Sequence, residues 1–107
     1  MTTEDFNQIV EEQINRCRNV LLIKKEEYAA GKDRLAAFKK AGAIQDQSME
    51  KAALGMLSKH LVSISDMILA PAPELFGIDR WNEKITDAIN YLLIIRAIIE
   101  EEAHGQN

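Results

Sequence analysis

Residues 79–105 read DRWNEKITDAINYLLIIRAIIEEEAHG, and this stretch decides the fold. Its apolar residues recur at steps of three and four, the period of an amphipathic α-helix, with Asp79 as the expected N-cap and His104-Gly105 as the expected end. The main apolar face is predicted to contain Trp81, Ile85, Ala88, Ile89, Leu92, Ile95 and Ile99. The segment Tyr91–Ile99 is apolar nearly all round, which is typical of a helix with partners on several sides.

Two further long helices are predicted upstream. The first spans about residues 3–30, because Thr2 or Thr3 can cap its start and Gly31 stops its apolar pattern. The second starts at Asp46 or Ser48 and ends before Pro71. Its apolar stripe has a period of 3.6 residues and consists of Leu54, Leu57, Leu61, Ile64 and Ile68.

The connecting segments complete an all-α fold. Residues 32–42 predict a short helical turn that ends at Gly42, and the run Ala70-Pro71-Ala72-Pro73 predicts a non-helical connector. With 107 residues the chain is expected to form a single domain, residues 1–107. Three main helices plus a short turn do not cover the apolar half of the last helix. We therefore expect an antiparallel bundle completed by oligomerisation, as a dimer or tetramer.

Composition excludes several kinds of function. The net charge of -4 is spread along the chain and no basic stripe is present, so duplex nucleic acid is not an expected partner. The single cysteine, Cys17, cannot form an intramolecular disulfide, which fits a reducing compartment. The first residues lack a secretory signal, and no apolar run approaches the ~20 residues of a membrane span. We expect a cytoplasmic protein with no membrane partner.

The last predicted helix presents a candidate metal site. Glu83 and Asp87 are four residues apart, which places two carboxylates one above the other, and Asn90 adds an amide oxygen one turn later. Mg²⁺ prefers such oxygen ligands and usually keeps several waters while it binds substrate phosphates. The alternative is an ordinary solvated acidic turn, favoured by the helix dipole.

The second predicted helix offers polar residues on the side away from its apolar stripe. Lys59 could meet phosphate oxygens, and Ser63 and Asp66 share its face. The alternative is that these residues form the solvent side of an amphipathic helix. His60 lies at the edge of the apolar face, where a hydrogen-bonded boundary histidine is commoner than a catalytic one. The sequence has no zinc-ligand spacing, glycine-rich phosphate loop or Ser-His-Asp arrangement.

Three segments together resemble a known group of proteins. The matching residues are Lys25, Tyr28, Gly31, Asp33, Arg34, Leu35, Phe38 and Lys39, then Lys59, His60, Ser63 and Asp66, then Glu83, Lys84, Ile85, Asp87, Asn90, Tyr91 and Leu92. The combination resembles the MazG-like, all-α nucleoside triphosphate pyrophosphatases and the nucleotide-modification-associated domains of phages. The resemblance covers about residues 24–95, and its last segment matches best.

The resemblance implies a nucleotide-handling protein with Mg²⁺, in a bacterial host cell if the chain is phage-derived. Glu83 and Asp87 would be catalytic and, with Asp66, would bind the metal. The residues implied for substrate binding are Lys59, His60, Asn90, Lys25, Tyr28 and Arg34. The family places a Glu-Glu-x-x-Glu cluster on the preceding helix, whereas the corresponding helix here supplies one acid, Asp66. This departure leaves open a non-catalytic phage accessory protein that acts through protein contacts.

Overall fold

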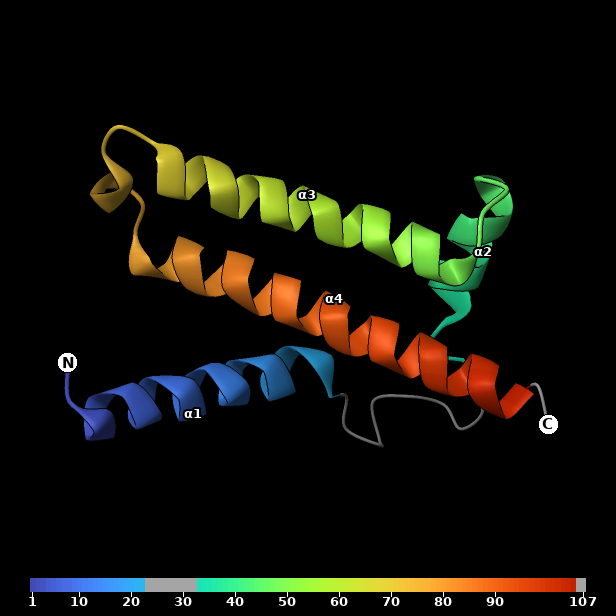
Figure 1. Cartoon of the computed structure of the whole chain (residues 1–107), viewed down its shortest axis with the longest axis horizontal. Helices are drawn as coiled ribbons and strands as arrows, with labels where there is room; N and C mark the ends of the chain where they lie inside the picture. The colour runs from blue at the N-terminus through green and yellow to red at the C-terminus, as the bar shows by residue number, and fades with distance from the viewer. Residues whose placement is uncertain (23–32, 106–107) are drawn as a thin grey trace.

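The computed structural model describes residues 1–22 and 33–105 and is all-α (Figure 1). The elements in chain order are α1 (Thr3–Leu21), α2 (Ala36–Ile44), α3 (Met49–Leu69), the short 3-10 helix η2 (Pro73–Leu75) and α4 (Ile78–Gly105). Within those two ranges no residue forms a β-strand. The predicted fold class is therefore confirmed as all-α.

The helices α3 and α4 form an antiparallel hairpin at the centre of the molecule (Figure 1). Ser48 caps α3, because its side chain accepts a hydrogen bond from the backbone N–H of Lys51 at 3.3 Å. The helix ends at Leu69, before Pro71, as the sequence predicts. The predicted connector after it contains η2, where Leu75 N–H donates to the Ala72 carbonyl at 3.0 Å.

The start of α4 lies two residues before the predicted one. The helix begins at Ile78, so Asp79 lies in its first turn rather than at the cap. The carbonyl of Gly77 accepts from the N–H groups of Arg80 and Trp81 at 3.1 and 3.3 Å. Asp79 still complements the positive end of the helix dipole from this position.

The helix α1 is shorter than the sequence predicts. Thr2 caps it through a 3.0 Å bond from the N–H of Asp5, but it ends at Leu21 instead of continuing to residue 30. Leu22 is extended, and the guanidinium of Arg34 donates to the Leu21 carbonyl at 3.0 Å. This contact satisfies one of the carbonyls that a helix end leaves without an internal partner. Residues 23–30 lie outside the described part.

The predicted turn over residues 32–42 is a helix, α2, which continues to Ile44 rather than ending at Gly42. Gly42 is buried within it, where the chain returns toward α3. Its carbonyl accepts from the N–H of Gln47 at 2.7 Å, and Asp46 adopts a left-handed φ of 52° in the turn. Asp tolerates this conformation better than most residues.

The core lies where α2, α3 and α4 meet. Phe38, Ala53 and Ile98 form a buried cluster, with Tyr91 packed edge-on to Phe38 at a ring separation of 6.4 Å. The small Ala53, fully buried, allows α3 and α4 to approach closely at this level. Partly buried residues packed against the cluster are Leu35, Met49, Met56, Tyr91, Ile94 and Ile95.

The predicted apolar stripe of α3 is rotated relative to the face that the helix buries. On α3, Leu57 is buried, but Leu54, Leu61 and Ile68 of the predicted stripe are at least half exposed. The residues that α3 buries are Ala52, Ala53, Leu57 and Met67. On α4 the predicted face is confirmed in part, since Ala88 is buried and most other members are partly buried, namely Trp81, Ile85, Ile89 and Ile95. Leu92 and Ile99 of that face are at least half exposed, and α4 also buries Thr86, Asn90 and Ile98. Each helix turns toward the neighbours available in one chain, and several of its apolar side chains stay exposed.

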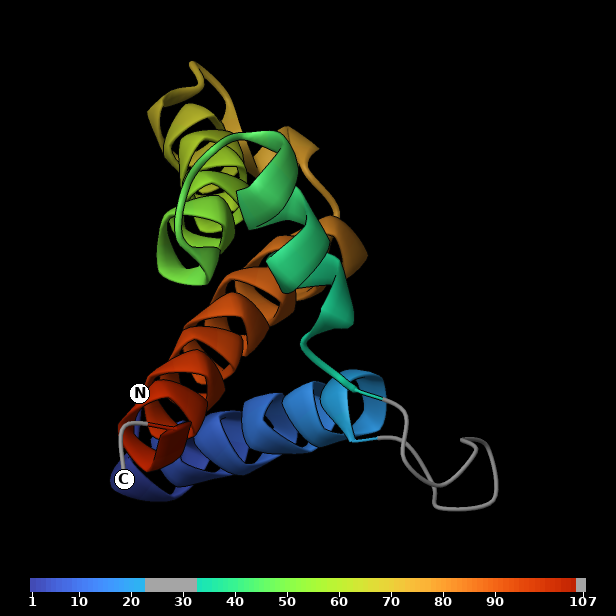
Figure 2. The same ribbon diagram turned by 90° about the vertical axis from the view of Figure 1, so that its right-hand side faces the viewer.

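The molecule is somewhat elongated. Its radius of gyration is 16.6 Å, compared with about 13 Å for a compact domain of this length. Figure 2 shows why: α1 crosses α4 at an angle and lies on the opposite side of α4 from α3. Among the described helices, α3 alone is long and apolar enough to cross a membrane by length and composition. This is weak evidence, because the core helix of a soluble protein passes the same test.

Candidate functional site

Two of the three segments that carry the family resemblance, those on α3 and α4, meet along the seam between these two helices. The ring of His60 stacks on the ring of Tyr91 with 5.1 Å between centroids and 30° between planes. The Nδ1 atom of His60 lies 3.8 Å from Oδ2 of Asp87. Both side chains of this pair are partly buried, with 22% and 32% of their surface exposed. The seam therefore places an aromatic pair beside a carboxylate of the predicted metal site.

Asp87 also faces a second neighbour, α1. A groove of about 370 Å³ runs between α1 and the first turns of α4. It is lined by Arg16, Asn19, Val20, Asp79, Asn82, Glu83, Thr86 and Asp87. We call it the polar groove, since most of these side chains offer hydrogen-bond donors or acceptors. Asp87 belongs both to this groove and to the pair with His60.

Buried polar groups surround the polar groove. Gln13 donates from Nε2 to Oγ1 of Thr86 at 2.8 Å, and this bond ties α1 to α4. Asn90 is one turn beyond Thr86 on the same side of α4. It is only 5% exposed, and neither its amide nitrogen nor its amide oxygen has a hydrogen-bond partner. Buried polar atoms are nearly always paired, so an unpaired amide at this place is unusual.

The predicted convergence of three carboxylates does not occur. Glu83 and Asp87 share the polar groove, but Asp66 is exposed on α3 and is not among its lining residues. In residues 1–22 and 33–105, no group of three or more His, Cys, Asp or Glu side chains could hold a metal ion. The reason is rotational, since the face that α3 turns toward α4 carries His60, and Asp66 lies well round the helix from it.

The residues implied for substrate binding separate in space. Lys59 is exposed on α3, and Arg34 lies beside Leu93 and Ile94, roughly 15 Å along α4 from Glu83 at 1.5 Å per residue. Arg34 therefore does not join the polar groove; it bonds the end of α1 instead. His60 contacts Asp87, which lines the groove. Asn90 is one turn of α4 beyond Thr86, another lining residue. Lys25 and Tyr28 lie outside the described residues.

Two other residues of the resembling segments have a structural role. Lys39 bridges Asp33 and Glu101 with N–O distances of 2.6 and 2.9 Å, and so ties the start of α2 to the end of α4. The hydrogen bond from Lys39 holds the pKa of Asp33 below its ordinary value, and the bond to Asp33 raises the pKa of Lys39. This clasp lies at the opposite end of α4 from the polar groove.

Several groove residues were not anticipated from the sequence. Gln13 interrupts the apolar stripe of α1 between Val10 and Cys17, which was a signal that α1 has a polar partner at that level. Thr86 lies off the predicted apolar face of α4 and gave no comparable signal. Arg16 and Asn19 had no signal, because a polar residue on the flank of a helix is ordinary.

No protein-family model, no curated protein and no solved structure matches this chain.

Proposed function

We propose that this protein binds a nucleotide through its phosphates in the polar groove between α1 and α4, with a divalent cation held by Glu83 and Asp87. The supporting observation is that these two carboxylates, one helical turn apart, share the groove with a guanidinium, that of Arg16. Acids and a base on opposite walls suit a ligand that is itself an anion neutralised by a cation.

Each wall would contact a different part of such a ligand. Arg16 on α1 lines the groove. Its guanidinium pairs with Glu12 of the same helix at 3.9 Å. Planar guanidinium groups recognise phosphate oxygens in a bidentate manner. Asn19 and Asn82 add donors and acceptors that suit a polar ligand.

The residues present fit a Mg²⁺ ion that is bound mainly by its ligand and by water. Mg²⁺ is commonly held by one or two carboxylates together with substrate phosphates, so a third protein carboxylate is not required. When bound, the ion would bridge phosphate oxygens and offset their charge. His60 would position Asp87 from the other side, because its ring is fixed by stacking on Tyr91. Pyrophosphate release, which the family resemblance implies, would require this arrangement.

Isothermal titration calorimetry with nucleoside triphosphates, with and without MgCl₂, tests the proposal directly. We expect Mg²⁺-dependent binding that Asp87→Asn or Glu83→Gln weakens by roughly 100-fold or more, since each change removes charge but keeps shape. A pyrophosphate-release assay on the same samples separates binding from hydrolysis.

The matched control is Asp66→Asn, which removes an exposed acid outside the groove. Binding should survive this change. If Asp66→Asn is as damaging as Asp87→Asn, the groove is not the site. If no triphosphate binds with either Mg²⁺ or Mn²⁺, the proposal fails.

A second candidate is a non-catalytic accessory protein that acts through protein contacts. The observation that favours it is an apolar patch at the turn between α3 and α4, where the side chains are 59–82% exposed. Its members are Ile68, Leu69, Leu75 and Ile78. Large exposed apolar patches commonly mark interaction sites. This function would be sensitive to Leu69→Ser and insensitive to Glu83→Gln, the opposite of the first proposal.

A further inference from the structure

The apolar stripe of α1 is covered over only part of its length. Cys17 is buried against α4 at 5% exposure, but Phe6 is 58% exposed and Val10 38% exposed on the same side of the helix. The cause is the crossing of the two helices, since α4 comes nearest to the second half of α1, where Gln13 bonds Thr86 and Cys17 is buried (Figure 1). The first half of the stripe has no partner within the described chain.

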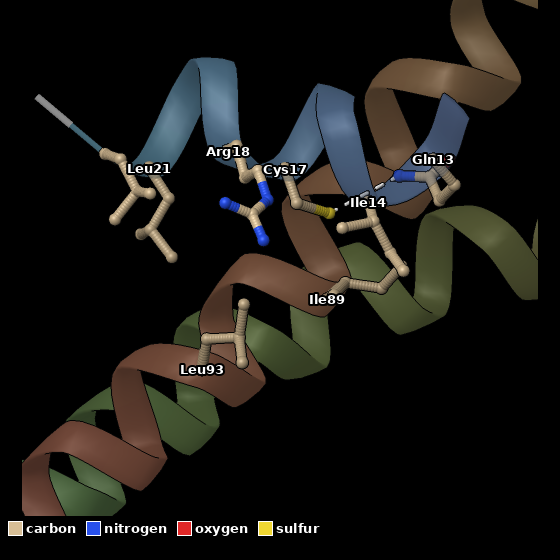
Figure 3. Close-up of a pocket in the computed structure, with 8 residues that line it drawn as sticks. Gln13, Ile14, Cys17, Arg18, Leu21, Ile89 and Leu93 are labelled. Atoms are coloured by element: carbon tan, nitrogen blue, oxygen red, sulfur yellow. Dashed lines mark hydrogen bonds between the residues drawn. The ribbon is translucent and has the colours of Figure 1, made fainter. Parts of the chain in front are cut away.

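The uncovered stripe continues into a hollow between α1 and α4. Figure 3 shows Ile14, Leu21, Ile89 and Leu93 around this hollow, whose volume is about 440 Å³. A smaller neighbouring hollow shares Leu21, Leu22 and Leu93 with it, so the two are continuous. We call this surface the α1–α4 apolar face and define it by Phe6, Val10, Ile14, Leu21, Leu22 and Leu93.

The surface area of the chain indicates how large a partner is needed. The accessible surface is 8129 Å², whereas a compact monomer of 12.1 kDa exposes about 6000 Å². The excess, about 2000 Å², is spread over the elongated chain, and an obligate homodimer interface is large enough to bury a substantial part of it. A small ligand in the 440 Å³ hollow would cover far less.

The charges of α1 favour a second copy of the same chain in one orientation. The first half of α1 contains four acids, and the second half contains two arginines. The acids are Glu4, Asp5, Glu11 and Glu12, and the bases are Arg16, which faces the polar groove, and Arg18, which lines the hollow of the α1–α4 apolar face and is the base available to a partner there. A two-fold axis perpendicular to two such helices pairs them antiparallel, and in that orientation the acidic half of each lies against the basic half of the other, which the charges favour over a parallel pair.

We propose that a second copy of this chain covers the α1–α4 apolar face, in a two-fold dimer whose α1 helices pair antiparallel. The contact buries Phe6, Val10 and Ile14 of both copies and fills the hollow beside Leu93. The polar groove lies on the other flank of α1 and stays accessible. This dimer is independent of nucleotide binding, so either proposal can fail without the other.

Light scattering coupled to size exclusion, over a range from micromolar to several hundred micromolar protein, tests the dimer. The wild-type chain should have the mass of two 12.1 kDa chains. Ile14→Glu should raise the dissociation constant by roughly 100-fold or more, because the two-fold axis buries the new charge twice. Ile14 is 44% exposed in the single chain, so circular dichroism of the variant should retain the helices.

The matched control is Val62→Glu on α3, which is 59% exposed and outside the α1–α4 apolar face. It should remain dimeric. If Ile14→Glu fails to fold, Phe6→Glu at the start of α1 tests the same face. A monomeric wild-type protein throughout the range overturns the proposal. So does a Val62→Glu variant that dissociates while Ile14→Glu and Phe6→Glu do not.

Charge exchange tests the antiparallel orientation. Arg18→Glu should weaken the dimer, and adding Glu4→Arg and Asp5→Arg to it should restore the wild-type dissociation constant. Failure of the combined variant to recover would rule out the antiparallel pairing.

Discussion

Gly42 and Gly55 both lie inside helices, but only Gly55 has room for a side chain. A Cβ on Gly42 would lie 2.7 Å from the Gln47 carbonyl oxygen and 3.2 Å from the Ser48 carbonyl carbon, which are backbone atoms that cannot rotate away. A Cβ on Gly55 would meet nothing within 4 Å. The close approach at Gly42 is what allows α2 to turn directly into α3.

This difference gives a paired prediction. Gly42→Ala should destabilise the protein by about 1–3 kcal/mol, because the α2–α3 turn must shift to make room. Gly55→Ala should stabilise it by about 0.5–1 kcal/mol, since alanine loses less backbone entropy in an exposed helix position. Urea unfolding of both variants gives the two values. Equal effects of the same sign would contradict the geometry of the turn.

At Asn90, the stability of the protein and the binding of a ligand are expected to favour different residues. Its amide is buried without a hydrogen-bond partner, and an unsatisfied buried group of this kind costs about 1–3 kcal/mol. Asn90→Leu, which is similar in volume, should therefore raise the free energy of unfolding. If the amide serves a ligand in the polar groove, the same variant should lose nucleotide affinity. Chemical unfolding and calorimetry on one sample measure both effects.

Thr86→Val is the comparison for Asn90→Leu. Thr86 is buried like Asn90, but its hydroxyl accepts a hydrogen bond from Gln13. Removing the hydroxyl leaves the Gln13 amide without that partner and should destabilise the α1–α4 contact. A stabilising Thr86→Val together with a destabilising Asn90→Leu would reverse the assignment of satisfied and unsatisfied groups.

At the scale of elements, the two ends of α4 are joined to the rest of the molecule by different forces. Near the start of α4, Thr86 binds Gln13 of α1, and Asp87 pairs with His60 of α3. Near its end, Glu102 meets Glu50 of the first turn of α3. The contact between the two carboxyl groups lowers the pKa of Glu50 and raises the pKa of Glu102.

This pair predicts a pH dependence of stability. The pKa of Glu102 is raised on folding, so its contribution is full at low pH and is lost as pH rises through the folded pKa. The pKa of Glu50 is lowered, so its contribution is lost as pH falls. Glu102→Gln keeps a donor for Glu50 without a charge. The variant should therefore be more stable than wild type at about pH 8, with the difference shrinking toward about pH 5.

Thermal unfolding across that pH range measures the difference. Glu100→Gln is the control, because its partners Arg96 and His104 hold the pKa of Glu100 below its ordinary value. That change should lose stability at neutral pH rather than gain it. A Glu102→Gln variant that behaves like Glu100→Gln would show that Glu50 and Glu102 do not share a proton.

At the scale of the whole molecule, the single chain buries few large side chains. Met67 and Ile98 are the largest that are fully buried among the described residues. Apolar side chains of α1, α3 and α4 stay exposed, and the proposed dimer would cover those of the α1–α4 apolar face. If the α1–α4 apolar face is a dimer interface, the thermal midpoint should rise with protein concentration, and in Ile14→Glu it should not. This is a second measure of the proposed dimer.

Local signals in the sequence were enough to predict the helical class and both limits of α3. Ser48 and Pro71 bound α3 because a side-chain cap and a missing N–H act on their own neighbours, whatever the rest of the chain does. The spacing of Glu83 and Asp87 similarly places two carboxylates on one side of α4. Such effects depend on residues within one helical turn.

Only the tertiary structure decided which helix faces meet. The leucine pattern of α3 was about as compatible with a face centred on Leu61 as with the face centred on Ala53 that packs against Ile98. That rotation brought His60 to Asp87 and left Asp66 in solvent, which removed the predicted third metal ligand. The carbonyl of Leu21 at the end of α1 likewise accepts a hydrogen bond from Arg34, thirteen residues away along the chain. Rotation about a helix axis depends on neighbours that are distant in sequence, and periodicity alone does not contain that information.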